Sequence, residues 1–359
     1  MQGPDTVAAV VLAAGESRRF GSPKQLAELE GRTLLELVLE RARAAELSPV
    51  VAVVPVWLTR PASMAAEELR WVRNPHPGRG LSHSLRLGFE ALPDEVVAAM
   101  ILLGDQPLIP LGHLHAMVEA RGEAPLIASR HAGVASPPLL VERSHFGLVA
   151  EAHGDSGLRN VIAARPELVR AVELAAPLPD VDSRTDLEEL RAAEEPCQGC
   201  GARYVPVADA GTHGYIGASR ACWSAFGELL AREFSDMRYG IVHRHTVDVY
   251  AAQHPGTDGR RERQSVALHL VAICHWLEHG LGTAELNPLT QQLANEDRAW
   301  PWLDPPSDYD MTLRDVLGAT SPDEHVALVR RWAESVWRAW APHHSVVRAW
   351  AAEALSQRG

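Results

Sequence analysis

Small residues and cations share one short segment near the start of the chain. Ala13, Ala14 and Gly15 place little side-chain bulk beside their backbone amides, so an anion can approach closely. Arg19 and Lys24 bring positive charge to the same segment. The segment has neither of the two common nucleotide-loop spacings, GxxxxGK(S/T) and GxGxxG. We interpret it as a loop that binds a triphosphate; the alternative is an ordinary strand-to-helix turn with surface cations.

One acidic residue farther along the chain could hold a metal ion. Asp105 comes shortly after the apolar run 98–103, which is an expected strand. Mg²⁺ prefers hard oxygen ligands and phosphate bridges, so a carboxylate at a strand end beside a phosphate loop predicts magnesium binding. The alternative is a helix N-cap or a turn at Asp105.

A second polar segment, at residues 74–85, contains glycines and serines just before an expected helix. A helix that begins there can point its free backbone amides at a phosphate group or at the edge of a nucleobase. We therefore include Gly80 and Ser84 among the expected nucleotide-binding residues.

The second half of the chain contains a CxxC pair, Cys197 and Cys200. Thiolates at this spacing, with glycines that permit a tight turn, occur in many zinc sites. His213 and Cys222 are the expected further ligands of such a Zn²⁺ ion. His243, His245 and His254 are alternatives for the histidine position, and the spacing matches no named zinc finger. A structural zinc ion, a metal-free turn and a redox pair all remain open.

Strand and helix patterns alternate through the first half. Buried strands are expected at 7–12, 50–56, 70–73, 98–103 and 126–129, and helices at 34–47, 85–92 and 111–120. This order predicts a doubly wound, mostly parallel α/β sheet. Ligands of such sheets bind beyond the carboxyl ends of the strands. The phosphate loop, segment 74–85 and Asp105 all follow expected strands, so we expect them to share one site.

The second half is expected to be mostly α-helical and to form a separate domain. Helices are predicted at 222–234 and 264–278, and a third is predicted to begin at Ser321, where Pro and Glu follow in the first turn. A stripe of apolar residues on that third helix is expected to be core: Trp332, Val336 and Trp340.

Length and charge exclude several classes of protein. A chain of 359 residues can form two domains, expected at 1–192 and 193–359. The net charge of −12 argues against a nucleic-acid-binding protein. The first apolar run is too short to span a bilayer and no basic region precedes it, so we expect a cytoplasmic protein without a membrane segment.

The first half resembles the MobA-like nucleotidyltransferases, whose signature reads LAAGxSxRxGxPK. The match extends over about residues 5–192, and the signature positions present are Leu12, Ala13, Ala14, Gly15, Ser17, Arg19, Gly21, Pro23 and Lys24. Segments 154–159 and 180–187 resemble the family's GDxGxR and DxDTxxDL motifs. The chain departs from the family at Ser183, where Thr is usual, and at residues 135–137, where molybdenum-cofactor enzymes usually read GHP.

The resemblance implies transfer of a nucleotidyl group from a nucleoside triphosphate (NTP) to a phosphate-bearing acceptor. Arg19, Lys24 and Asp105 would be catalytic, with Arg19 and Lys24 on the β- and γ-phosphates. In the family an acidic residue of the closing motif completes the metal site, so Asp105 and Asp182 would hold Mg²⁺. We favour Asp182 over Asp180, although the spacing alone does not decide between them. The alternative role of this pair is helix capping. The expected nucleotide-binding set is Leu12, Ala13, Ala14, Gly15, Arg19, Lys24, Gly80, Ser84 and Asp105.

The resemblance also suggests the substrates. Guanylyltransferases of molybdenum-cofactor synthesis, which bind GTP, tend to read LAGG, whereas cytidylyltransferases read PAAG or LAAG, as this chain does from Leu12 to Gly15. We therefore favour CTP and molybdopterin. Another phosphorylated acceptor, such as a sugar phosphate, is the alternative within this enzyme class. A non-catalytic alternative is a nucleotide sensor that contacts a partner such as an apo-molybdoenzyme.

The second half resembles a family of small bacterial proteins of unknown function, recognised by CxxCGA, a following CW, and VDxYxxQHP. The matching positions are Cys197, Cys200, Gly201, Ala202, Cys222, Trp223, Val247, Asp248, Tyr250, Gln253, His254 and Pro255. This resemblance implies no activity.

Overall fold

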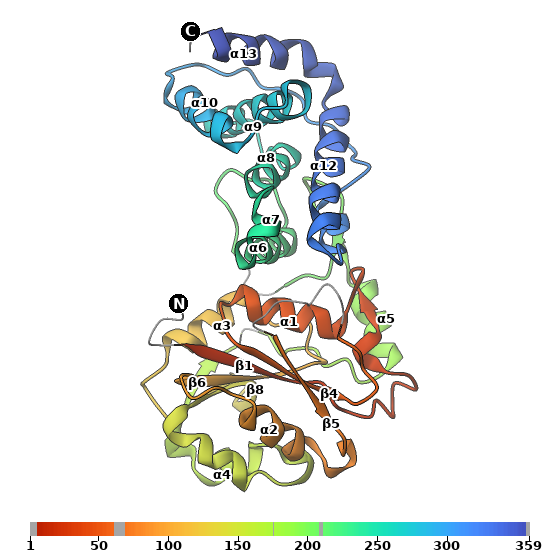
Figure 1. Cartoon of the computed structure of the whole chain (residues 1–359), viewed down its shortest axis with the longest axis vertical. Helices are drawn as coiled ribbons and strands as arrows, with labels where there is room; N and C mark the ends of the chain where they lie inside the picture. Colours follow the sequence, from red (N-terminus) through yellow and green to blue (C-terminus); the bar gives the residue numbers. More distant parts are fainter. Residues whose placement is uncertain (1–5, 61–68, 175, 208–210, 357–359) are drawn as a thin grey trace. The chain divides into compact units, whose positions relative to one another are not determined.

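The computed structural model describes residues 6–60, 69–174, 176–207 and 211–356, and the expected domain limits at residues 1 and 359 lie outside this part. The chain divides into two compact units (Figure 1). Unit 1 comprises Met1–Ala193 with Val205–Ala210, and unit 2 comprises Glu194–Tyr204 with Gly211–Gly359. Val205 belongs to unit 1 because its amide donates to the Glu30 carboxylate at 2.7 Å and its side chain packs in that unit's core.

The core of unit 1 is a seven-stranded sheet in the order β5-β4-β1-β6-β8-β7-β9. The strands are β1 (Val7–Leu12), β4 (Val50–Pro55), β5 (Leu69–Asn74), β6 (Ala98–Leu103), β7 (Leu126–His131), β8 (Val134–Glu142) and β9 (Val169–Glu173). Strand β8 runs antiparallel to β6 and β7, and the other neighbours are parallel. The prediction of a mostly parallel, doubly wound sheet is confirmed.

Helices cover both faces of the sheet (Figure 1). Helices α1 (Leu34–Ala44) and α3 (Leu111–Glu119) lie on one face, and α2 (Leu81–Glu90) and α4 (Arg159–Ala164) on the other. Strand β1 contributes Val7, Ala9 and Val11 to the first core and Val10 and Leu12 to the second. Side chains of a strand alternate between its faces, so a strand between two helical layers is apolar throughout.

Local capping fixes where two helices of unit 1 begin. Thr33 and Glu36 form a capping box at α1, the first of the expected helices. Ser183 and Asp186 form another at α5 (Arg184–Ala192), so Ser183 caps this helix as Thr would. The remaining short elements of unit 1 are the hairpin β2 (Glu28–Leu29) and β3 (Arg32–Thr33) and several 3₁₀ turns.

Unit 2 is mostly helical, as predicted. It begins with a hairpin of β10 (Glu195–Pro196) and β11 (Arg203–Tyr204). Its helices are α6 (Arg220–Ser235), α7 (Met237–Gly240), α8 (His243–Gln253), α9 (Arg260–His279), α10 (Thr283–Asn295), α11 (Leu313–Leu317), α12 (Pro322–Ala339) and α13 (His344–Ser356). The predicted apolar stripe on α12 is core, because Trp332, Val336 and Trp340 have no exposed surface.

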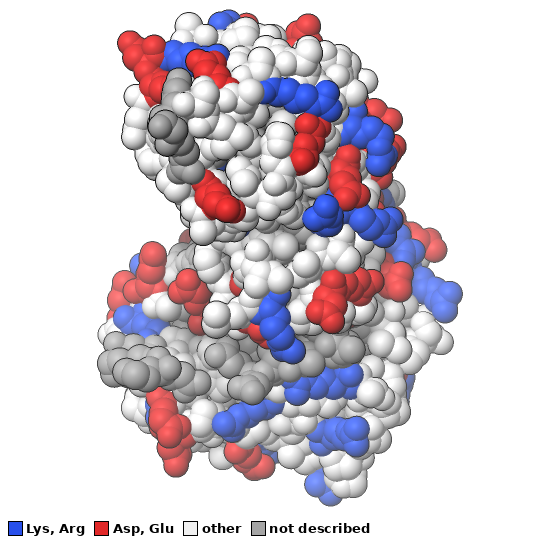
Figure 2. Space-filling model, turned by 45° about the horizontal axis from the view of Figure 1, so that its top comes forward, with Lys and Arg blue, Asp and Glu red and all other residues white. Residues whose placement is uncertain are grey.

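Among the described residues, no helix has the length and apolarity needed to cross a bilayer. On the face shown in Figure 2, Lys and Arg residues are separated by uncharged and acidic residues. They do not merge there into one broad cationic surface.

Candidate functional site

The carboxyl ends of β1 and β6 lie side by side at the centre of the sheet. Leu12 is paired in register with Leu103, and the Gly104 amide donates to the Leu12 carbonyl at 3.0 Å. A Cβ at Gly104 would lie only 2.8 Å from the Cβ of Ala13, so this close approach requires glycine. The loops that follow these two strands are thereby brought together at one sheet edge, where open parallel sheets bind ligands.

The loop after β1 is held by a buried glutamine, Gln25. Its side-chain amide donates to the carbonyls of Ala13 and Gly15, each at 2.8 Å. Its amide oxygen accepts from the Ser17 hydroxyl at 3.3 Å, and that hydroxyl accepts from the Lys24 amide at 3.1 Å. Gln25 therefore ties the start of the loop to its end, where Ser17 holds the Lys24 backbone.

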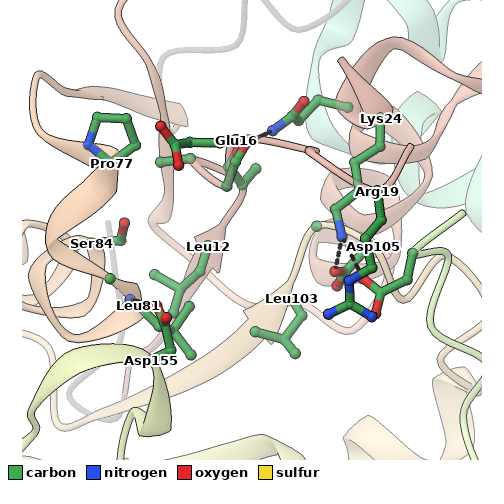
Figure 3. Close-up of a pocket in the computed structure, with 17 residues that line it drawn as sticks. Leu12, Glu16, Arg19, Lys24, Pro77, Leu81, Ser84, Leu103, Asp105 and Asp155 are labelled. Atoms are coloured by element: carbon green, nitrogen blue, oxygen red, sulfur yellow. Dashed lines mark hydrogen bonds and ion pairs between the residues drawn. The ribbon is translucent and has the colours of Figure 1, made fainter. Parts of the chain in front are cut away.

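Two cations of this loop meet two carboxylates. The Lys24 ammonium lies 2.5 Å from an Asp105 oxygen and 3.1 Å from an Asp182 oxygen. The Arg19 guanidinium lies 3.1 Å from the other oxygen of Asp182. Figure 3 shows Arg19, Lys24 and Asp105 converging on one side of the pocket. All four residues were predicted, and the structure brings them together.

Backbone pairing carries Asp182 to this position. The amide of Val181, which is fully buried, donates to the Asp105 carbonyl at 2.9 Å. The neighbouring carboxylate of Asp180 instead accepts from the Gln106 side chain at 2.8 Å. Asp182, and not Asp180, therefore shares the Lys24 ammonium with Asp105.

The electrostatics of the cluster favour a charged lysine. Burial alone lowers the pKa of Lys24, but the Asp105 and Asp182 carboxylates outweigh burial, and the pKa is raised above its usual value. The Asp105 side chain is only 21% exposed, and its Oδ1 atom is buried without a hydrogen-bond partner. A buried carboxylate oxygen without a donor, beside a second carboxylate that already attracts a cation, fits a divalent metal ion.

The opposite side of the pocket is formed at the start of α2, where Figure 3 shows Leu81, Ser84 and Asp155. An Asp155 oxygen accepts from the Leu81 amide at 3.2 Å. Gly80 has φ of +84°, and a Cβ there would lie 2.7 Å from that carboxylate. The Ser84 hydroxyl accepts from the Asn74 side chain at 2.9 Å. The segment thus requires glycine at position 80 for both its conformation and its contact.

Together these residues enclose a cavity of about 410 Å³, within the usual range for small-molecule sites. Every residue of the expected nucleotide-binding set lines it, as does Asp182. Seven further lining residues were not in the expected nucleotide-binding set, although Pro77, Leu81 and Asp155 belong to segments singled out from the sequence: Glu16, Gln25, Pro77, Leu81, Leu103, Gly104 and Asp155. Several of them are adjacent in sequence to predicted residues, but their residue types alone do not indicate contact with a ligand.

A second cluster of predicted side chains lies in unit 2. Cys197, Cys200 and Cys222 gather with His254, and their ligand atoms all lie within 4.8 Å of one another. The prediction of His213 as the histidine of this group is wrong. Its ring packs instead against Tyr215 and Trp223, with centroid distances of 4.4 and 5.0 Å. His254 occupies the position because it ends α8 beside the cysteines, where its Nε2 lies 3.4 Å from the Cys222 sulfur.

The two other histidines considered for this position lie elsewhere in unit 2. His243 pairs with the buried Glu233 carboxylate at 2.9 Å. His245 stacks on Trp276 with a centroid distance of 3.8 Å, and burial lowers its pKa to about 4. Both rings therefore contact residues of neighbouring helices and do not belong to the cysteine cluster.

Comparison with known proteins agrees with this division. Residues 9–171 match the model of the "MobA-like NTP transferase domain", and residues 195–341 match a "Family of unknown function (DUF5946)". The purine catabolism protein PucB of Bacillus subtilis is 29% identical over 196 residues, which cover 51% of this chain and 95% of PucB. The bifunctional protein GlmU of Sorangium cellulosum is 34% identical over 146 residues, 37% of this chain and 30% of GlmU.

Among solved structures, Rv0371c from Mycobacterium tuberculosis H37Rv is 26% identical, with a TM-score of 0.47. The match covers 53% of this chain and 100% of that one. On the family-model matches alone, residues 9–171 form a MobA-like NTP transferase domain, and residues 195–341 match DUF5946.

Proposed function

We propose that unit 1 is a Mg²⁺-dependent enzyme that transfers CMP from CTP to molybdopterin and releases pyrophosphate. The observation that carries this proposal is the meeting of Lys24, Asp105 and Asp182 beside the small-residue loop at Gly15. A module that only binds nucleotide has little need of two carboxylates at the phosphate position. Their presence supports catalysis over sensing.

The reaction is a displacement at the α-phosphorus of the nucleotide. An oxygen of the acceptor phosphate forms a bond to this phosphorus, and the bond from phosphorus to the bridging oxygen of pyrophosphate breaks. In our proposal Arg19 and Lys24 bind the β- and γ-phosphates and stabilise the charge that develops on the leaving group. Positioning and charge neutralisation supply the rate, and no covalent intermediate is required.

Asp105 and Asp182 are the residues that would hold Mg²⁺. Bound there, the ion would neutralise phosphate charge as a Lewis acid. The partnerless Asp105 oxygen and the shared Lys24 ammonium support this assignment, because both indicate a site that attracts a cation.

The preference for CTP and molybdopterin has a narrower basis. It rests on Ala14 in the LAAG sequence, a position where guanylyltransferases of the resembling branch tend to have glycine. Ala14 is one of the residues that line the cavity.

The test is release of pyrophosphate from each of the four common NTPs with Mg²⁺, with and without molybdopterin. We expect release with CTP that depends on molybdopterin. If release depends on a sugar phosphate instead, the protein is still a nucleotidyltransferase, but its acceptor is not molybdopterin. Tight NTP binding without release under any condition would favour a sensor that contacts an apo-molybdoenzyme.

Variants connect this activity to the site. We expect Lys24→Ala or Asp105→Ala to reduce release by about 10²–10³-fold or more, the usual effect of removing one electrostatic contact to a transition state. Arg170→Ala is the matched control, because Arg170, on β9, forms an exposed pair with Glu123 and is not among the residues that line the cavity. Unchanged rates in both site variants would refute these residue roles.

A further inference from the structure

The CxxC pair of unit 2 lies in the turn of the β10–β11 hairpin. The Cys197 amide donates to the Ala202 carbonyl at 2.7 Å, and the Gly201 amide donates to the Cys197 carbonyl at 2.8 Å. Gly201 has φ of +76°, a conformation that favours glycine. The sequence CxxCG therefore folds locally into a tight knuckle that is closed by backbone hydrogen bonds, as in many zinc sites.

Two helices bring the other two ligands to this knuckle. Cys222 lies in the first turn of α6, where its amide donates to the N-cap hydroxyl of Ser219 at 3.2 Å. His254 is the residue that ends α8. The Gly217 amide donates to the His254 carbonyl at 3.0 Å and so fixes the backbone at this end. Three segments distant in sequence thus meet at one point within unit 2.

The distances in this cluster fit a tetrahedral zinc ion. The sulfurs of Cys200 and Cys222 are 3.9 Å apart, and Nε2 of His254 is 3.4 Å from the Cys222 sulfur. Zinc bonds to sulfur and nitrogen of their usual lengths, at tetrahedral angles, predict separations of about 3.8 Å and about 3.5 Å. The sulfur separation is also far too long for a disulfide, and all four cysteines of the chain are free thiols.

Neighbouring groups orient the ligands as they do around bound zinc. Nδ1 of His254 lies 2.7 Å from the Tyr250 carbonyl. A proton on Nδ1 donates to that carbonyl and leaves the Nε2 lone pair directed at the sulfurs. The Ser219 amide donates to the Cys197 sulfur at 3.3 Å, and the Tyr250 hydroxyl lies 3.6 Å from the Cys222 sulfur.

The cluster is closed to solvent. Cys222 and His254 have no exposed surface, and Cys197 and Cys200 are 2% and 5% exposed. A Cβ at Gly199 would lie 2.5 Å from the His254 ring, so the knuckle packs directly on the fourth ligand. Four buried protein ligands without an open position are the pattern of a structural zinc site and not of a catalytic one.

We propose that unit 2 binds one structural Zn²⁺ ion, which ties the β10–β11 hairpin to the start of α6 and the end of α8. The ligands are Cys197, Cys200, Cys222 and His254. This proposal is independent of the proposed function of unit 1, since none of its ligands belongs to that unit.

The test uses the full chain, purified under reducing conditions without added metal. Elemental analysis should find about one zinc ion per chain. Replacement by Co²⁺ should give the visible absorption of tetrahedral cobalt with thiolate ligands. Cys222→Ser and His254→Ala should each reduce zinc content at least tenfold. His213→Ala and Cys274→Ser are the matched controls and should retain zinc, because neither residue belongs to the cluster.

The wild-type chain provides a measurement that does not depend on the folding of variants. Chelation should release zinc and, in parallel, make three of the four cysteines reactive toward a thiol reagent. Fresh protein that contains no zinc and binds no Co²⁺ would overturn the proposal. Zinc that is retained in His254→Ala but lost in His213→Ala would overturn the ligand set, and a disulfide between cluster cysteines would identify a redox pair instead.

Discussion

At the scale of single residues, Lys24 lies between the carboxylates proposed to hold Mg²⁺ and the proposed position of the triphosphate. Its ammonium contacts Asp105 and Asp182, and its backbone amide is fixed by the Ser17 hydroxyl. A cation held between two carboxylates neutralises their repulsion when no other cation is bound. The same side chain lies at the edge of the cavity where a triphosphate would bring negative charge.

The neighbouring aspartates provide the sharpest residue-scale prediction. We expect Asp182→Asn to reduce pyrophosphate release by about 10²–10³-fold and to raise the Mg²⁺ concentration needed for half-maximal activity, because a proposed metal ligand is lost. Asp180→Asn should change both quantities far less, since Asp180 contacts Gln106 and not Lys24. Measuring release against Mg²⁺ concentration for both variants checks this. The reverse order of effects would assign the metal to Asp180.

A second residue-scale prediction concerns Gly80. Gly80→Ala should raise the KM for NTP at least severalfold, because a methyl group in this left-handed conformation would contact the Asp155 carboxylate and displace the start of α2. Gly147→Ala is the control, since Gly147 lies outside segment 74–85 and a Cβ there meets no atom within 4 Å. Steady-state kinetics of the two variants, with thermal melting to verify folding, provide the measurement. Equal KM values would contradict a role of this segment in nucleotide binding.

At the scale of elements, one buried carboxylate joins three helices of unit 2. Glu233 on α6 is 1% exposed. Its oxygens contact His243 at 2.9 Å and Thr246 at 2.5 Å, both on α8, and His325 at 3.0 Å, on α12. Burial by itself raises the pKa of Glu233, but hydrogen bonds from these partners outweigh burial and lower the pKa below its usual value of 4.5.

This network predicts a specific dependence of stability on pH. A carboxyl group with a lowered pKa stabilises the fold above pH 4.5, and this contribution is lost as the pH falls through the lower, folded-state value. We expect Glu233→Gln to cost roughly 1.5–3 kcal/mol near neutral pH, the usual contribution of hydrogen bonds to a charged group. The difference from wild type should shrink below pH 4.5.

Denaturant unfolding at several pH values measures this difference. Glu334→Gln on α12 is the control, because Glu334 forms an exposed pair with Arg330 and should cost less than about 1 kcal/mol. A Glu233→Gln effect that is independent of pH would contradict the ionised state of Glu233.

At the scale of the whole molecule, each unit has its own means of holding its fold. Unit 1 has a sheet with an apolar core on each face. Unit 2 has helices packed around buried tryptophans and the proposed zinc site. The proposed active site draws only on unit 1, and the proposed zinc site only on unit 2.

We therefore expect Cys222→Ser to lower the thermal stability of unit 2 while leaving NTP turnover near the wild-type rate. Calorimetry, which follows the unfolding of both units, and pyrophosphate release on the same sample test this together. A fall in turnover that parallels the loss of zinc would contradict independent units.

Much of the fold of unit 1 could be predicted from sequence, because its signals are local. An unbroken apolar run such as β1 predicts a strand buried on both faces, and Thr33 with Glu36 predicts a helix start within one turn. Strand β8 was not predicted because it contains Pro137 and Pro138, residues that are rare in strands. Strand β9 lies at the edge of the sheet and is only partly buried, so its apolar pattern is weak.

By itself, the sequence predicted a division of the chain into two parts, a loop of small residues and cations after β1, and a carboxylate after β6, because each prediction depends on residues close together in the chain. Only the tertiary structure decided that Asp182 meets Lys24 across 158 positions, and that His254 replaces His213 beside the cysteines. The physical reason is the same in both cases. Strand order, helix ends and a few backbone hydrogen bonds decide which distant residues come into contact. The spacing of residues along the chain does not reveal these contacts.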